Sequence, residues 1–263
     1  MRPEILDKKF SLERVGLLMR NRAMEDLGAF LIVAGVCAAN NILSLIFSDT
    51  AAFNHPFSSH GETIWCMIIV LGGLLYAGRA FRAMHDGRGG ADWILLPATP
   101  LEKYVAAFAS YVLFYPVLAS LAAFGLSAAF EGVARALHGA SGVIFNPLIG
   151  LSLSGVAGYA TLASLALAAS ARFSKIPLVK AAALASAWGV VLGLFFLGGL
   201  LVFTPEGREV LARHHRDFQF ASNPEEEPLL TWLFRAFAAA TGVFAVTYGY
   251  FRVAEKEAAD EVQ

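Results

Sequence analysis

The pattern of hydrophobic and polar positions divides the chain into six long apolar runs separated by shorter polar stretches. Each run reaches the roughly 20 residues that a helix needs to cross a ~30 Å hydrocarbon core. The runs are too long for strands and lack the alternation of apolar and polar residues that strands show. The pattern therefore predicts an all-α polytopic membrane protein with six transmembrane helices in a domain of residues 27–251. These helices are expected at about 27–47, 63–83, 104–130, 147–171, 179–203 and 229–251.

Residues 1–26, ahead of the first run, are mostly polar or amphipathic and lack the short charged start of a cleavable signal. From residue 10 to residue 24, apolar side chains group apart from charged ones at helical spacing. This grouping predicts an interfacial elbow helix, with its apolar side in the acyl boundary and its arginines among the headgroups. The residues that define it are Phe10, Arg14, Leu17, Leu18 and Arg20. An ordinary juxtamembrane helix without a special role is the alternative interpretation.

Composition agrees with a membrane protein. The 263 residues are 57% apolar and 16% charged, with a mean hydropathy of +0.60, which exceeds the usual globular composition. The net charge of −1 provides no overall field that would recruit nucleic acid. Cys37 and Cys66 both fall inside apolar runs, where small buried side chains are a better interpretation than a disulfide or a metal site.

The distribution of Lys and Arg predicts the orientation of the chain in the membrane. The N-terminal segment, the segments after the second and fourth runs, and the tail together carry fifteen of these residues. The intervening segments 48–62, 131–146 and 204–228 carry four. Because positive residues concentrate on the cytoplasmic side, both termini, including the tail 252–263, are predicted to be cytoplasmic.

Groups that could carry out catalysis are missing from the predicted spans. An intramembrane enzyme needs a nucleophile with a base, or a set of metal ligands, inside the bilayer. All six histidines fall in predicted loops, and the neighbouring His214 and His215 are typical of solvated loop residues rather than of zinc ligands. The sequence therefore predicts no catalytic, metal-binding or cofactor-binding residues, and the chain is not expected to be an enzyme.

A source of energy within the chain is also missing. An ion-driven carrier usually needs an ionisable group at membrane depth, yet the centres of the runs hold no Asp or Glu. Arg235, just inside the last run, either extends to the interface or contacts a substrate along a possible transport path. A phosphate-binding loop requires a Gly-Lys pair, which the chain lacks. Energy from ATP would have to come from another subunit that binds the nucleotide and its magnesium.

The polar segment RAFRAMHDGRGGADWILLPATPLEKY, residues 79–104, separates the second and third runs. Within it, Thr99 and Glu102 have the spacing of a capping box, in which each side chain bonds the other residue's backbone amide. Pro100 then occupies the first helical position, where its missing amide hydrogen costs nothing. The segment is therefore predicted to turn sharply and begin a helix at Leu101. Pro116, further along the same helix, is expected to kink it.

Residues Leu95-Leu96-Pro97-Ala98-Thr99-Pro100-Leu101-Glu102-Lys103-Tyr104 resemble the Leu-Pro-Ala-[Ser/Thr]-x-x-Glu-Lys segment between the second and third spans of bacterial type-2 ABC (ATP-binding-cassette) permeases. The chain is also similar to that family in size, in its six predicted spans and in its elbow helix. The resemblance implies a coupling helix that docks in a cleft of a separate ATPase subunit. The implied coupling residues are Trp93, Leu95, Leu96, Pro97, Thr99, Pro100, Leu101, Glu102 and Lys103. Glu102 either only caps its own helix or also meets a basic residue of the ATPase.

The expected function is that of a multi-pass permease subunit of an ABC exporter in the bacterial inner membrane. Its expected partners are ATPase subunits, a second permease that is identical or similar, and membrane lipids, but not nucleic acid. ATP and magnesium would bind the ATPase, and no cofactor would bind this chain. Two alternatives stay open: a membrane scaffold or assembly factor that transports nothing, and a secondary transporter. No motif identifies a substrate.

Overall fold

The computed structural model describes residues 10–46, 59–85, 93, 95–138, 153–180, 182–183 and 228–261. All regular secondary structure in these residues is helical, which confirms the predicted all-α class for this part of the chain. The elements are α1 (Leu12–Ile46), α2 (Ser59–Ala77), the 3₁₀ turn η1 (Ala83–His85), α4 (Pro100–Phe108), the π-helical segment η2 (Ala109–Phe114), α5 (Tyr115–His138), α7 (Leu153–Arg172) and α10 (Pro228–Glu261).

The predicted apolar runs other than the fifth overlap these helices, whereas residues 184–203 of the fifth run lie outside the described residues. Within the described part, the continuous helical stretch Pro100–Phe130 is the one that is long and apolar enough to cross a membrane. The apolar stretches Phe30–Ala39 and Cys66–Ala77 are shorter. The structure therefore establishes the helical class, and the number of membrane spans stays a prediction.

Helix α1 is a single unbroken helix of 35 residues. The sequence placed an interfacial helix at residues 10–24 ahead of a first span at 27–47, and in the structure residues of both ranges belong to this one helix. The position of its first part at the membrane interface stays a prediction. The junction contains no proline, and two of its polar side chains bond to residues far along the chain while α1 continues. Arg22 donates to the backbone carbonyl of Ala80 at 3.3 Å, and Asp26 accepts a hydrogen bond from the Tyr111 hydroxyl at 2.6 Å.

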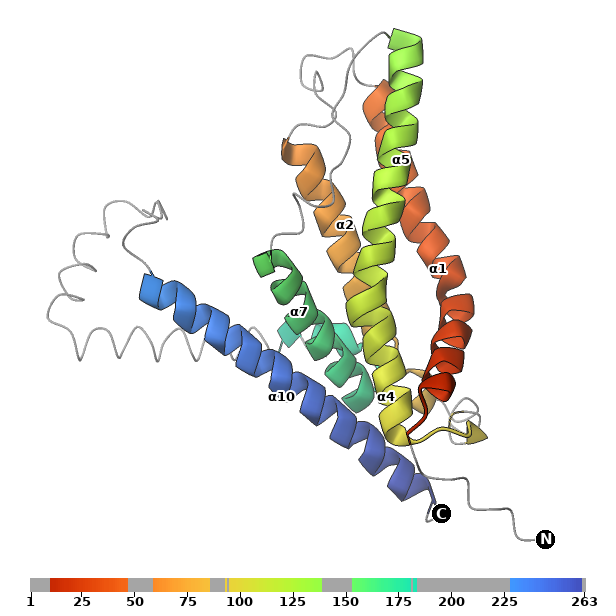
Figure 1. Cartoon of the computed structure of the whole chain (residues 1–263), viewed down its shortest axis with the longest axis vertical. Helices are drawn as coiled ribbons and strands as arrows, with labels where there is room; N and C mark the ends of the chain where they lie inside the picture. The colour runs from red at the N-terminus through yellow and green to blue at the C-terminus, as the bar shows by residue number, and fades with distance from the viewer. Residues whose placement is uncertain are drawn as a thin grey trace, which may run out of the picture.

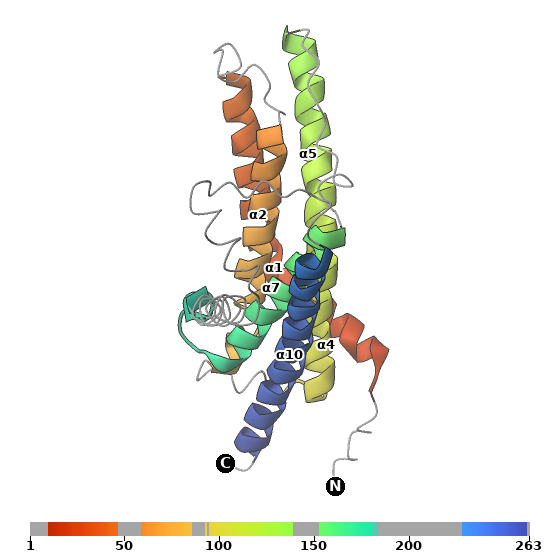
Figure 2. The same ribbon diagram turned by 90° about the vertical axis from the view of Figure 1, so that its left-hand side faces the viewer.

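The helices form two groups that meet at one end of the molecule (Figures 1 and 2). Helices α1, α2 and α5 run alongside one another, and α4 continues into η2 and α5 as one long rod. Helix α10 crosses obliquely and packs most extensively on α7. Small side chains allow this close approach: a Cβ added at Gly249 of α10 would lie 3.2 Å from the Cα of Ala168 and 2.8 Å from the Tyr104 hydroxyl.

The π-helical segment η2 explains how the long rod accommodates Pro116. The amide of Tyr115 donates to the carbonyl of Ser110, five residues back, at the end of this segment. In the same register the carbonyl of Tyr111 would accept from residue 116, but proline has no amide hydrogen. The hydroxyl of Tyr159 on α7 donates to this carbonyl instead, at 2.7 Å. The expected disturbance at Pro116 is thus a π-helical turn preceding the proline, and it is stabilised by a neighbouring helix.

Candidate functional site

The start of α4 is fixed by the predicted capping box. The Thr99 amide donates to Oε2 of Glu102 at 2.8 Å, and the Glu102 amide donates to the Thr99 hydroxyl at 3.3 Å. Pro100 occupies the first turn, where no amide hydrogen is needed. The sequence prediction of a sharp turn and a capped helix start is confirmed, because the interaction involves only residues three positions apart.

Glu102 also binds the beginning of α1, which sequence reasoning missed. Its Oε1 atom accepts from the Ser11 amide at 2.6 Å and from Nε and Nη2 of Arg14 at 3.1 and 2.8 Å. The carboxylate therefore serves two helix N-termini, its own and that of α1, where a negative charge is favourable. Glu102 is fully buried, so the basic residue it meets belongs to its own chain.

The surroundings of Glu102 determine its charge state. This residue lies in the first turn of α4, ahead of the predicted span 104–130. Burial raises the pKa of the Glu102 carboxyl, but hydrogen bonds from the Arg14 side chain and from two backbone amides outweigh burial, and the pKa lies below its usual value. The carboxylate is consequently ionised at neutral pH and can hold Arg14 through charge-assisted hydrogen bonds.

Lys103 binds the opposite end of the chain. Its Nζ atom donates to Oε1 of Glu257 on α10 and to the carbonyl of Trp93, both at 2.8 Å. The same atom lies 5.3 Å from the centre of the Trp93 ring. Lys103 is 2% exposed, so its charge is directed into the protein rather than toward a partner. Neighbouring residues of α4 therefore fasten the two ends of the chain.

An aromatic cluster packs behind this junction. The guanidinium of Arg22 lies 5.6 Å from the Phe81 ring centre and 5.5 Å from the Trp93 ring centre. Phe81 and Trp93 meet edge to face at 5.7 Å, and Phe81 stacks on Tyr104 at 5.9 Å. Trp93 is 7% exposed, so the expectation that it offers its ring to a groove on a partner is not met. The pattern of a short apolar segment gave no indication of this inward position.

The surface of the predicted coupling loop is formed by fewer residues than the sequence indicated. Leu95 is 78% exposed and Leu101 is 42% exposed, and Pro97 is exposed between them. Leu96 is half-buried against the core, while Thr99 and Pro100 are partly covered at the helix start. We call Leu95, Pro97 and Leu101 the docking face, because these are the predicted residues whose side chains are accessible.

Segments predicted to be cytoplasmic gather around the docking face. Ser11 and Arg14 at the start of α1 and Glu257 near the end of α10 contact α4 directly. The last turns of α7 contact η1, since a ring nitrogen of His85 lies 3.0 Å from the Ser170 carbonyl oxygen. Exposed basic residues at these segments are Arg79, Arg82, Arg172, Lys175 and Lys180.

The remaining predicted residues are dispersed. Phe10, Leu17 and Arg20 are exposed near the start of α1, whereas Leu18 is partly covered. Arg235 has an exposed side chain on α10, far along the chain from the docking face. His214 and His215 lie outside the described residues. Within the described ranges, no group of three or more His, Cys, Asp or Glu side chains could hold a metal ion.

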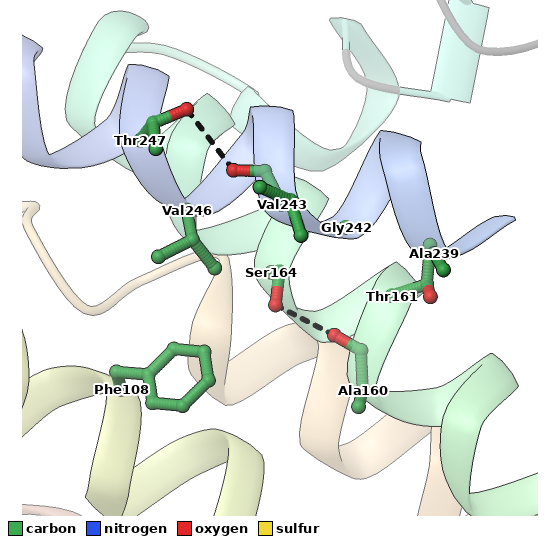
Figure 3. A pocket seen from close by; sticks show the side chains of 9 residues that line it. All are labelled: Phe108, Ala160, Thr161, Ser164, Ala239, Gly242, Val243, Val246 and Thr247. Atoms are coloured by element: carbon green, nitrogen blue, oxygen red, sulfur yellow. Dashed lines mark hydrogen bonds between the residues drawn. The ribbon is translucent and has the colours of Figure 1, made fainter. Parts of the chain in front are cut away.

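A shallow apolar groove of about 300 Å³ lies between α4, α7 and α10 (Figure 3). Phe108, Ala160 and Val246 contribute to its lining. The hydroxyl groups in the groove are already used, because Ser164 and Thr247 donate to carbonyls of their own helices at 2.7 and 3.0 Å. None of the docking-face residues is among those that line the groove.

Comparison with known proteins adds no further identification. No protein-family model matches the chain, and neither a curated protein nor a solved structure matches it. The resemblance to type-2 ABC permeases therefore depends on residues 95–104 and on the predicted order of spans. The geometry at the start of α4 is the observation on which a functional proposal can be based.

Proposed function

We propose that the chain is the transmembrane permease subunit of an ABC exporter, driven by separate ATPase subunits in the bacterial inner membrane. On this proposal it crosses the membrane six times with both termini in the cytoplasm. It pairs with an identical or similar second permease. The observation that carries the proposal is the capped start of α4, where Leu101 is exposed and is preceded by the exposed Leu95, beside the start of α1 and the end of α10.

The chemistry of the docking face supports a protein partner. Exposed leucine side chains next to a rigid helix start provide apolar anchors whose loss of freedom on binding is small. The neighbouring Arg79 and Arg82 are exposed and would suit either lipid headgroups or an acidic edge of the ATPase. Closure of the ATPase subunits on ATP would tilt this loop. The tilt would change the spans from inward to outward access or open a lateral path for an amphipathic substrate.

Two alternative functions differ in what they require. A scaffold or assembly factor needs the exposed leucines for a protein partner but needs no ATPase. A secondary transporter needs an ionisable group that changes its state within the membrane. Asp26, directly ahead of the predicted first span, is half-buried and hydrogen-bonded to Tyr111, and a test of ion coupling would address it.

Purification of the tagged full chain from its own membranes tests the proposal. We expect a protein with a GxxxxGK[ST] loop to co-purify, and we expect the complex to hydrolyse ATP. Elution of the chain alone, with no nucleotide-dependent activity, would contradict the proposal and favour the scaffold. Transport that collapses with the proton or sodium gradient but ignores ATP depletion would favour the secondary transporter.

Matched variants make this experiment specific for the docking face. Leu101→Asp places a charge at the accessible apolar surface and should release the ATPase. Ile176→Asp is the control, because Ile176 is 64% exposed in another turn at the same end. Its φ of 51° is a conformation that Asp tolerates better than Ile. Equal ATPase recovery with both variants would show that the partner does not bind at residue 101.

A further inference from the structure

Adjacent residues of α4 hold the two ends of the chain. Glu102 binds Ser11 and Arg14 at the start of α1, and Lys103 binds Glu257 near the end of α10. Ser11 precedes Glu102 by 91 residues, and Glu257 follows Lys103 by 154 residues. Because successive residues on a helix point in different directions, one turn of α4 can bind two elements on different sides.

These contacts are built to persist. Both anchoring side chains are almost fully excluded from solvent, at 0% and 2% exposure. Loss of either partner would leave an uncompensated charge in the interior, which is strongly unfavourable. Each anchor also has a second attachment, since Glu102 caps α4 through Thr99 and Lys103 bonds the Trp93 carbonyl. The arrangement therefore resists separation of α4 from either chain end.

One residue of the docking face, Leu101, lies on the same turn of helix. Leu101 directly precedes the two anchoring residues, and its side chain points outward while theirs point inward. A displacement of Leu101 by a partner would be transmitted through one helical turn. It would reach α1 through a carboxylate and α10 through an ammonium group.

We propose that Glu102 and Lys103 form a clasp that makes the docking face, the start of α1 and the end of α10 move as one body. Both are thus positioning residues for the coupling of ATP hydrolysis to span movement. This inference extends the proposed function, but the clasp is a property of the chain alone. It can be tested without a partner.

The test measures distances between spin labels on the full chain in detergent micelles. Labels at Pro97 and Ala258, both exposed positions, report on the loop and on α10, after Cys37 and Cys66 are replaced. The original chain should give one narrow distance distribution. Lys103→Met keeps the length and apolar stem of the side chain but removes its charge, and it should broaden the distribution.

Exchange of the two charges tests whether a broad distribution comes from loss of the ion pair between residues 103 and 257 or from general loss of structure. The double variant Lys103→Glu, Glu257→Lys restores an ion pair with reversed polarity and should narrow the distribution again. Glu257→Gln is a second single variant, which removes the charge of the partner side chain, and it should broaden the distribution while the helical content stays unchanged. Narrow distributions in both single variants would overturn the clasp, as would an exchange variant as broad as Lys103→Met.

The same variants distinguish failure of the clasp from failure of the proposed function. If an ATPase binds the original chain, Lys103→Met should retain binding because the docking face is unchanged. Addition of ATP and vanadate should then change the distance between the labels at Pro97 and Ala258 in Lys103→Met, whereas in the original chain this distance should stay the same. The same response of the distance in both chains would overturn the clasp. Absence of ATPase binding to the original chain would refute the proposed function. The clasp would then be decided by the label distances measured without a partner.

Discussion

The Tyr159 hydroxyl should contribute more to stability than an ordinary hydrogen bond between helices. It donates to the carbonyl of Tyr111, which loses its partner inside the rod because residue 116 is a proline in the π-helical register. Tyr159 is 7% exposed, so water cannot replace the hydroxyl easily. Tyr159→Phe therefore removes one hydroxyl and leaves a buried carbonyl without a partner.

The magnitude follows from comparing two cases. A hydrogen bond between helices in a membrane protein contributes on average only about 0.6 kcal/mol. A buried backbone group left without a partner costs about 1–3 kcal/mol. Tyr159→Phe belongs to the second case, so its cost should exceed about 1 kcal/mol. For a chain of this size each kcal/mol corresponds to a shift in Tm of roughly 2–4 °C.

Thermal unfolding in detergent, followed by circular dichroism at helical wavelengths, measures this cost. Tyr248→Phe is the matched control, because the Tyr248 side chain is 37% exposed on α10 and stacks on Phe244. Its loss of a hydroxyl should change Tm little. Pro116→Ala supplies the rescue, since it returns an amide hydrogen that can bond the Tyr111 carbonyl. In the Pro116→Ala background, Tyr159→Phe should cost less than it does in the original chain.

The reasoning would be refuted by either of two results. One is a Tm shift for Tyr159→Phe no larger than that for Tyr248→Phe. The other is equal destabilisation by Tyr159→Phe with and without Pro116, because the carbonyl would then not depend on the missing amide hydrogen.

Three further predictions follow from local geometry. Thr99→Ala removes the cap of α4 and should destabilise the chain by about 0.5–2 kcal/mol in the same unfolding assay; an unchanged Tm would contradict the role of the cap. Gly249→Ala should cost about 1–3 kcal/mol, because its Cβ would overlap the Tyr104 hydroxyl at 2.8 Å, whereas Gly242→Ala, with its nearest contact at 3.4 Å, should be neutral or stabilising. The depressed pKa of Glu102 means that its contribution to stability is complete above the ordinary value of 4.5 and is lost only as pH falls through the lower folded value. Glu102→Gln should therefore remove a stability increment at neutral pH that shrinks under acid, and a constant increment would refute the assignment.

The sequence predicted interactions between residues close together along the chain and missed those between residues far apart. The capping box and the start of α4 were predictable because Thr99 and Glu102 are three residues apart and interact within one turn. The helical class followed from the length of the apolar runs and from their lack of strand-like alternation. The contact between Arg14 and Glu102 was not predictable, because it joins residues 88 apart and each has several solvated alternatives.

Two other differences have physical causes. The continuity of α1 from the predicted interfacial helix into the predicted first span was not evident from the sequence, because Arg22 and Asp26 bond to Ala80 and Tyr111, which lie far along the chain. Trp93 was assigned to a partner because a large apolar residue in a loop suggests a docking anchor. Within the fold it is the ring against which Arg22 and Lys103 pack. Burial of a single aromatic residue cannot be deduced from a segment that has no regular period.

The burial of charge at residues 102 and 103 is itself informative about the role of this turn. A buried ion pair adds little net stability compared with apolar side chains of similar volume, because desolvation offsets most of the attraction. Apolar residues would therefore stabilise the packing of α4 on α1 and α10 equally well, but apolar contacts would allow the helices to slide past one another. Charged hydrogen bonds from Arg14 and to Glu257 fix direction as well as distance. A helix start that only reversed the direction of the chain would not require contacts of fixed direction and distance. A helix start that transmits displacement from the docking face to α1 and α10 would require them.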